Sequence, residues 1–433
     1  MENFDVSQTK SEWSLGMEEK RFAHENLPPA IQAKADQMNL DAAAVPAYSV
    51  PDLPIDANTS PEEFERDIRP HLLDEFKRSM YGEIPPVCEK LEFVLRKEHI
   101  AFDGLAICRQ IDIICSNNDW VHTIPLLLYI PCERHGKVPV IFGLNFLGLT
   151  AVTRDPGVIF NKFDRAEDLG TIRYADNRAG ESDRGCKAYR WEIEKVLQKG
   201  FAAATVCYHD IFLDRPDGFA GSVMRLFYSA EEWADPMRNT GAISAWAWGI
   251  MRALDCLEQQ AELDSSRFVV HGHSRLGKTA LWAGANDPRI WLTVSNCSGT
   301  CGAKLTHRYF GEDFAWLDVW NSRWFCGKFR EYAGRDEEYP VDQHFLMAAI
   351  APRLLYIASA SEDLYADPEG EYLSGVLASP AWNVYGKNGL ENTVFPPCGK
   401  LIGGDVGYYL RKGDHEFMPE NWDALLEFIQ KRI

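Results

Sequence analysis

The 433-residue sequence lacks the features that mark membrane and low-complexity proteins. It contains no run approaching the roughly 18 uncharged apolar residues that a membrane-spanning helix needs, so no such helix is predicted. No internal repeat or low-complexity tract occurs. Residues 1–8 lack a basic segment followed by an apolar one, so no signal peptide is predicted.

Positive charge is also scarce. The sequence has 45 Lys and Arg residues against 64 Asp and Glu residues, which gives a formal net charge of −19. Such a balance argues against nucleic acid and anionic membrane surfaces as partners. An acidic protein that binds an acidic ligand needs a local cluster of cations, so the positions of Lys and Arg near any candidate site matter.

The eleven cysteines lack the regular spacing of a disulfide framework. Cys297 and Cys301 lie four residues apart, but no second pair with zinc-finger spacing follows, so no metal site is expected. These two residues, Cys256 and Cys326 are predicted to be small buried residues. Free cysteines without a signal peptide predict a cytoplasmic protein, or a secreted or periplasmic one if a natural leader has been removed.

The hydrophobic content of 46% is sufficient for a large core. Residues 91–95, 108–115 and 122–130 are predicted to form an antiparallel meander. From residue 138 onward, strand-like and helix-like segments alternate, which predicts a mainly parallel sheet between two helical layers, a three-layer αβα sandwich. A helix is expected to begin after Ser60, which has Glu63 three residues on.

The stretch from Arg267 to Ala285 has the order of a nucleophile elbow. A buried apolar run at 268–270 leads through Gly272 and His273 to Ser274, and a helical pattern follows. Such a turn pushes a serine hydroxyl out of a sheet and places it at a helix N-terminus. The usual motif is G-x-S-x-G, whereas Gly277 here comes one position late. An ordinary Gly-Ser turn before a helix remains the alternative.

A nucleophilic serine needs a histidine base and an acid that orients it, in the chain order Ser, acid, His for an α/β-hydrolase fold. His415 is the best base, because it lies between the last predicted strand and the last helix. Asp363 follows the strand predicted at 353–358 and is the preferred acid. Glu362 and Asp367 are competing candidates, and a solvated carboxylate cluster is a further alternative. Among the other histidines considered, which are His273, His307 and His344, the last is expected to be structural.

Two cations follow the serine. The backbone N–H of Arg275 is where an oxyanion donor belongs, and its guanidinium can add a charged hydrogen bond. Lys278 lies one helical turn after Ser274 and can face the same pocket. In an acidic protein this pair indicates an anionic substrate, although Lys278 on a solvated helix surface is the plainer alternative.

The sequence resembles the glucuronoyl esterases of carbohydrate esterase family 15 over residues 80 to 433. The core Ser274-Arg-Leu-Gly-Lys278 is the most specific carrier. The remaining carriers are residues 143–148, 245–249, 272–285, 342–344 and 351–359. The resemblance implies an α/β-hydrolase catalytic domain, here expected at 61–433 with a long insertion around 149–195. A Pro-rich arm at 1–60 is expected to pack on it.

The resemblance also implies an activity and site roles. Ser274 would be the nucleophile, His415 the base and Arg275 the oxyanion stabiliser, with Lys278 and Glu312 binding the sugar. Members cleave esters between 4-O-methyl-glucuronate on xylan and lignin alcohols, with no metal and no organic cofactor. The expected partner is therefore glucuronoxylan or a small glucuronate ester, and the protein is expected to be a monomer.

Two residues depart from the family pattern. Many members carry the acid as Glu in Ser-Asn-Glu-Ser-Gly, where this chain has Ser295-Asn-Cys-Ser-Gly299. Some bacterial members use an Asp in a later loop, which Asp363 matches, so the acid is assigned to Asp363. Tyr365 stands where that loop usually has a Trp that stacks on the sugar. An esterase of other specificity, such as an acetyl xylan esterase, and a uronate-binding protein with weakened catalysis are the alternatives.

Overall fold

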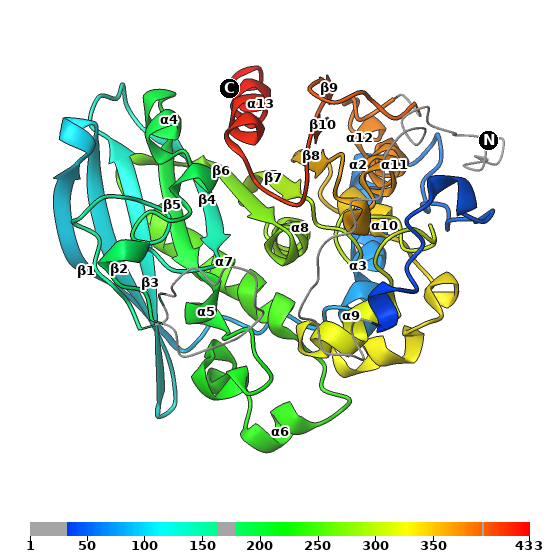
Figure 1. Ribbon diagram of the computed structural model, residues 1–433, viewed down its shortest axis with the longest axis horizontal. Coiled ribbons are helices and arrows are strands. Elements are labelled where there is room, and N and C mark those ends of the chain that lie inside the picture. Colours follow the sequence, from blue (N-terminus) through cyan, green and yellow to red (C-terminus); the bar gives the residue numbers. More distant parts are fainter. Residues whose placement is uncertain (1–32, 163, 165–177, 392–393) are drawn as a thin grey trace.

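The computed structural model describes residues 33–162, 164, 178–391 and 394–433. Within them a ten-stranded sheet crosses the molecule in the order β1-β2-β3-β5-β4-β6-β7-β8-β10-β9 (Figure 1). The strands are β1 (Lys90–Ala101), β2 (Ala106–Asn117), β3 (Trp120–Pro131), β4 (Val138–Asn145), β5 (Ala202–Cys207), β6 (Leu263–His273), β7 (Ile290–Asn296), β8 (Leu354–Ala360), β9 (Leu401–Gly403) and β10 (Val406–Arg411).

The sheet has an antiparallel part and a parallel part. β1, β2 and β3 form the predicted antiparallel meander, and β3 pairs antiparallel with β5. From β5 to β10 the neighbouring strands are parallel, so both predictions are confirmed. The chain adds β5 on one side of β4 and then β6 on the other. Open α/β sheets bind ligands beyond the carboxyl ends of the strands at such a reversal.

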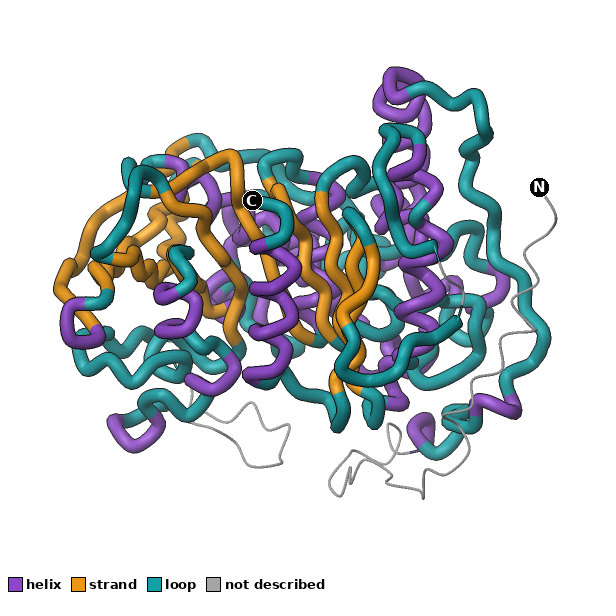
Figure 2. The backbone as a smooth tube through the Cα atoms, turned by 90° about the horizontal axis from the view of Figure 1, so that it is seen from above, coloured by secondary structure: helices purple, strands orange, loops and turns teal. Residues whose placement is uncertain are grey.

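Helices cover both faces of the sheet (Figure 2). Alternate residues of a strand enter different cores: Phe268 and Val270 of β6 face one hydrophobic cluster and Val269 faces the other. The described α-helices are α2 (Pro61–Glu63), α3 (Arg69–Ser79), α4 (Ile193–Gln198), α5 (Tyr208–Ile211), α6 (Ala230–Ala234), α7 (Ala242–Glu258), α8 (Arg275–Asn286), α9 (Phe314–Asn321), α10 (Gln343–Ala348), α11 (Pro368–Ala378), α12 (Pro380–Asn383) and α13 (Pro419–Gln430).

The two cores separate the helices into layers. Side chains of α3, α7, α8, α10 and α11 belong to the larger cluster, whereas those of α4 and α13 belong to the smaller one on the opposite face. This arrangement is the predicted three-layer sandwich. No helix in the described ranges has both the length and the apolar character needed to cross a membrane.

The described part of the N-terminal arm, residues 33–60, packs on the body of the protein. The carbonyl oxygen of Pro51 accepts a hydrogen bond from Nε2 of His344 at 2.9 Å, which gives this histidine a structural contact. The Gly311 N–H donates to the Asn39 carbonyl at 2.8 Å. The division into an arm and one catalytic domain stays a prediction. Residues 1–32 of that arm, and 163 and 165–177 of the expected insertion, lie outside the described residues.

Ser60 caps the helical segment that begins at Pro61, as predicted, because its hydroxyl oxygen accepts a hydrogen bond from the Glu63 N–H at 3.1 Å. We expect Ser60→Ala to lower the free energy of unfolding by about 1 kcal/mol, since it leaves an N–H of the first turn without its acceptor. Ser60→Asp retains an acceptor and should lose less. Denaturant unfolding followed by circular dichroism tests this, and equal losses for the two variants would contradict it.

Candidate active site

Ser274 occupies the turn between β6 and α8 in a strained backbone conformation, with φ 58° and ψ −130°. The turn is tight enough that a Cβ at Gly272 would lie 1.9 Å from the Leu276 carbonyl oxygen, so only glycine fits there. The Ser274 N–H donates to the Asn296 carbonyl at 2.9 Å. This geometry is that of a nucleophile elbow, with the serine at the N-terminus of a twelve-residue helix.

A cavity of about 160 Å³ opens at this turn, and all seven residues that the sequence analysis named as site residues line it. Three tryptophans, Trp316, Trp320 and Trp324, form much of the rest of its wall. The seven residues are Ser274, Arg275, Lys278, Glu312, Asp363, Tyr365 and His415.

His415 and Asp363 form a close hydrogen bond, with 2.6 Å between His415 Nδ1 and Asp363 Oδ2. The Nδ1–H donates to the carboxylate, so Nε2 is left as the ring's acceptor. Burial alone would lower the pKa of His415, but the Asp363 carboxylate, helped by Glu312, raises it above its ordinary value. Of the two competing acids, Asp367 binds Arg308 at 2.7 Å instead, and Glu362 is not among the described residues that line the pocket.

Cys297 lies beside this pair. Its Sγ, a carboxylate oxygen of Asp363 and a ring nitrogen of His415 are all within 4.8 Å of one another. Burial, followed by the charges of Asp363 and Glu371, raises the pKa of the thiol well above its usual value, so it stays protonated and neutral. The three groups are close enough to hold a metal ion, as are His99, Cys108 and Asp155 elsewhere. The buried state predicted for Cys256, Cys297, Cys301 and Cys326 is confirmed.

Arg275 is held by Asp214, a residue that the sequence analysis missed. The fully buried Asp214 carboxylate accepts from Arg275 Nη1 at 2.6 Å, from Arg323 Nη2 at 2.6 Å and from Trp324 Nε1 at 2.8 Å. Burial would raise the pKa of Asp214, but Arg323 and Arg275 outweigh it and lower the pKa to about 2. The Arg275 guanidinium also lies 4.7 Å from the Trp324 ring centroid. Its position beside Ser274 is therefore fixed on two sides.

Lys278 and Glu312 both line the pocket, and the charge of each shifts the pKa of the other. Lys278 is 3% exposed, and its Nζ donates to the Ser298 carbonyl oxygen. Burial lowers the pKa of Lys278, and Glu312 is the first group that opposes this shift. Burial likewise raises the pKa of Glu312 against the influence of Lys278. The Glu312 N–H donates to the Tyr365 carbonyl at 2.9 Å, which joins the loops that carry these two residues.

Two further residues, His273 and Glu371, are not among the described residues that line the pocket, but they contact residues that do. The His273 ring lies 4.5 Å from the His415 ring, between centroids, and its Nδ1 is 2.7 Å from the Asn296 amide nitrogen. Glu371 of α11 accepts from the N–H groups of Ser298 and Gly299 at 2.7 and 2.9 Å. Burial raises the pKa of Glu371 to about 7, although a hydrogen bond from Ser359 opposes the shift. Glu371 thus anchors the loop whose carbonyl holds Lys278.

The known proteins to which this chain is similar are esterases. Residues 226–386 match the family described as "Glucuronyl esterase, fungi". The chain is 36% identical over 411 residues to carbohydrate esterase MZ0003 of an unknown prokaryotic organism, which covers 94% of each chain. It is also similar, at 35% identity, to two solved structures. One is a promiscuous CE15 esterase from a marine bacterial metagenome (TM-score 0.83, 92% of this chain and 100% of that one). The other is the glucuronoyl esterase from Solibacter usitatus (TM-score 0.83, 90% and 99%).

Asp214→Asn should slow the reaction of Ser274 with a fluorophosphonate probe about 10- to 100-fold, because the neutral amide no longer holds the Arg275 guanidinium by charge. The rate of labelling is followed by intact-protein mass spectrometry. Asp217→Asn is the matched control, since Asp217 is an exposed aspartate that pairs with Arg215 on the surface. Equal labelling rates in both variants would show that Asp214 does not position Arg275.

Proposed function

This chain belongs to carbohydrate esterase family 15, the glucuronoyl esterases, and we propose that it hydrolyses esters of glucuronic acid through an acyl-enzyme on Ser274. The observation that carries the proposal is the His415–Asp363 hydrogen bond, at 2.6 Å, in the pocket that Ser274 also lines. We further propose the 4-O-methyl-glucuronate esters that join xylan to lignin alcohols as the natural substrate class, glucuronoxylan as the polymer and a monomeric enzyme.

In the acylation step, the Ser274 Oγ attacks the carbonyl carbon of the ester while His415 Nε2 takes its proton. Asp363 keeps the ring in the tautomer whose Nε2 can accept, and it stabilises the imidazolium that forms. The tetrahedral oxyanion is held by the Arg275 backbone N–H at the start of α8 and by the Arg275 guanidinium. His415 then protonates the departing alcohol. Water, activated by the same histidine, releases glucuronate from Ser274.

The cations beside the serine act on charge that develops during this reaction. The ester itself is neutral, so Arg275 and Lys278 match the oxyanion and the carboxylate product more than the ground state, as differential transition-state binding requires. Lys278 and Glu312 are proposed to bind the sugar hydroxyls, with Tyr365 in the place of the family's stacking Trp. The sequence pattern indicates an anionic substrate. The proposed substrate is instead a neutral ester, whose acyl group becomes an anion when it is released.

Two other functions remain distinguishable by experiment. An acetyl xylan esterase would have a higher kcat/KM for acetylated xylan than for benzyl glucuronate. A uronate-binding protein with weakened catalysis would bind glucuronate without turning over its esters. Neither is favoured, because Ser274, Asp363 and His415 line one pocket with Lys278 and Glu312.

Ser274→Ala and His415→Ala should each reduce kcat for benzyl glucuronate by about 10⁴-fold or more, because either change removes the nucleophile–base pair. Initial rates of benzyl alcohol release are measured by chromatography. Ser266→Ala and His135→Ala, on exposed parts of the chain, serve as controls and should retain wild-type rates. Residual hydrolysis within tenfold of wild type in either active-site variant would contradict the mechanism.

The pH dependence of kcat/KM should show the influence of Asp363. A base acts when deprotonated, so activity rises as pH increases through the pKa of His415, which lies above the ordinary histidine value of about 6.5. In Asp363→Asn the main group that raises this pKa is gone. The acidic limb should therefore move to lower pH, while the maximal rate falls about 10³- to 10⁴-fold. A limb that stays in place or moves to higher pH would reject Asp363 as the orienting acid.

A further inference from the structure

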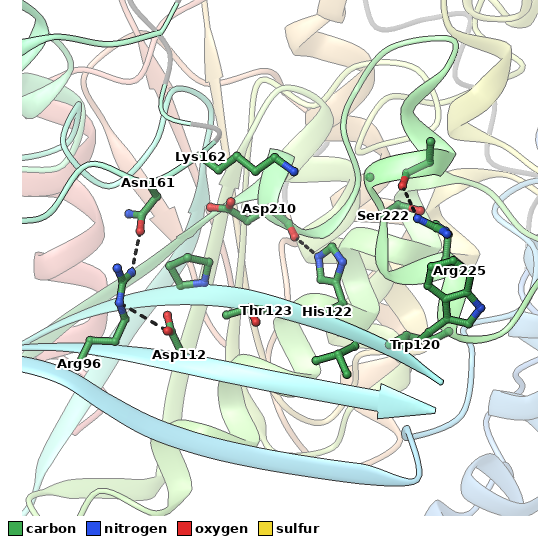
Figure 3. A pocket seen from close by; sticks show the side chains of 15 residues that line it. Arg96, Asp112, Trp120, His122, Thr123, Asn161, Lys162, Asp210, Ser222 and Arg225 are labelled. Atoms are coloured by element: carbon green, nitrogen blue, oxygen red, sulfur yellow. Dashed lines mark hydrogen bonds and ion pairs between the residues drawn. The ribbon is translucent and has the colours of Figure 1, made fainter. Parts of the chain in front are cut away.

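A second polar cavity, of about 470 Å³, lies beyond the carboxyl end of β5 (Figure 3). Its floor is the meander, with Trp120, His122 and Thr123 of β3 side by side in the view. Asp210 of α5 and Lys162 close the opposite side. No described residue lines both this cavity and the Ser274 pocket, so the two cavities are distinct.

The arginines of this cavity already have partners. Arg96 contacts Asp112, with Nε 3.4 Å from Oδ2, and its Nη1 donates to Asn161 Oδ1 at 2.8 Å (Figure 3). The Arg225 guanidinium lies 3.5 Å from the Trp120 ring centroid, and its Nη1 donates to the Ala220 carbonyl. An anionic ligand would have to compete with these contacts, so the lining does not favour one.

Unlike the two arginines, two carboxylate oxygens of the cavity have no hydrogen-bond partner among the described residues. These atoms, Asp210 Oδ2 and Asp112 Oδ1, are buried. Asp210 as a whole is only 3% exposed. A buried polar atom without a partner costs about 1–3 kcal/mol. A ligand that supplied hydroxyl groups would offset this cost at both oxygens, since hydroxyls donate as well as accept.

The raised pKa of Asp210 fits the same kind of ligand. Burial, followed by the charges of Asp164 and Asp112, raises the pKa of Asp210 well above its usual value. A protonated carboxyl has one O–H to donate and an oxygen that accepts, which a sugar hydroxyl can match in either direction. A metal cation, in contrast, would meet the neighbouring positive charges of Arg96 and Lys162.

The cavity and the candidate active site lie at the same edge of the sheet. Ser274 follows β6, and only β4 and β5 separate β6 from β3, the nearest strand that lines the cavity. Three strand spacings correspond to about 14 Å. A short segment joins the two places: Asp210 lines the cavity, and Asp214, four residues on, holds Arg275. A branched saccharide with its ester at Ser274 could therefore reach the cavity with another ring.

We propose that this cavity is a second carbohydrate subsite, which binds a neutral sugar ring of the polymer whose glucuronate ester is cleaved at Ser274. This inference rests on the proposed function for the identity of the polymer, but binding of a neutral sugar can be measured without catalysis. Asp210 and Asp112 provide the hydrogen bonds to hydroxyls, and Pro125, Leu226 and Trp120 provide apolar surface for the ring.

Binding is tested by isothermal calorimetry of xylotetraose with the Ser274→Ala protein, in which no ester chemistry intervenes. Adding Asp210→Ala or Thr123→Trp should weaken binding at least tenfold, the first by removing the buried carboxyl and the second by filling the cavity. Ile100→Trp is the control, because Ile100 is 62% exposed on the same sheet and does not line the cavity. Equal affinity in all variants, or no binding at millimolar xylotetraose, overturns the proposal.

Kinetics separate this proposal from the proposed function. The ratio of kcat/KM for a glucuronate methyl ester carried on a xylo-oligosaccharide to that for benzyl glucuronate should fall about five- to tenfold in Thr123→Trp and Asp210→Ala. It should stay constant in Ile100→Trp. If wild type hydrolyses neither ester, the proposed function fails while the calorimetry still decides the subsite. A ratio that is the same in all variants rejects the subsite alone. Thermal unfolding confirms that each variant is folded, and Thr123→Trp decides if Asp210→Ala is not.

Discussion

The backbone turn at Ser274 is the constraint on which the site depends. It requires a left-handed φ at the serine and no Cβ at Gly272, and it is held between β6 and α8, which are buried against the two cores. Because β6, β7, β8 and β10 are parallel neighbours, the residues after their carboxyl ends converge: Ser274, Cys297, Asp363 and His415 in that order. The sheet order, more than any local sequence pattern, brings nucleophile, acid and base into one pocket.

The second organising feature is the placement of cations in an acidic protein. Arg275 is oriented by Asp214, whose low pKa keeps it ionised, and Lys278 is held by the Ser298 carbonyl, whose loop Glu371 anchors. Both cations are thus fixed before substrate arrives, so little reorganisation is needed when negative charge develops on the carbonyl oxygen. Of the buried carboxylates around the serine, Asp214 binds Arg275 and Asp363 binds His415.

Sequence reasoning predicts the parts of the fold that consist of continuous apolar runs. β4 and β5 are such runs, and the elbow was visible from Gly272 and Ser274. It did not identify β9, which has three residues, or the short helices α5, α6 and α9. The choice among Glu362, Asp363 and Asp367 could not be settled locally, because it depends on which carboxylate reaches His415, 52 residues away from Asp363. No local sequence pattern indicated a role for Asp214, because its partners Arg275 and Arg323 lie 61 and 109 residues further along the chain.

The central claim is that glucuronate esters are cleaved through a covalent intermediate on Ser274. The most direct test is to quench the wild-type protein in acid during turnover of benzyl glucuronate and to map its proteolytic peptides by mass spectrometry. The account predicts a glucuronoyl adduct on the peptide that contains Ser274, which disappears when turnover is complete. Absence of any adduct under rapid quenching, or an adduct on a different residue, would contradict it.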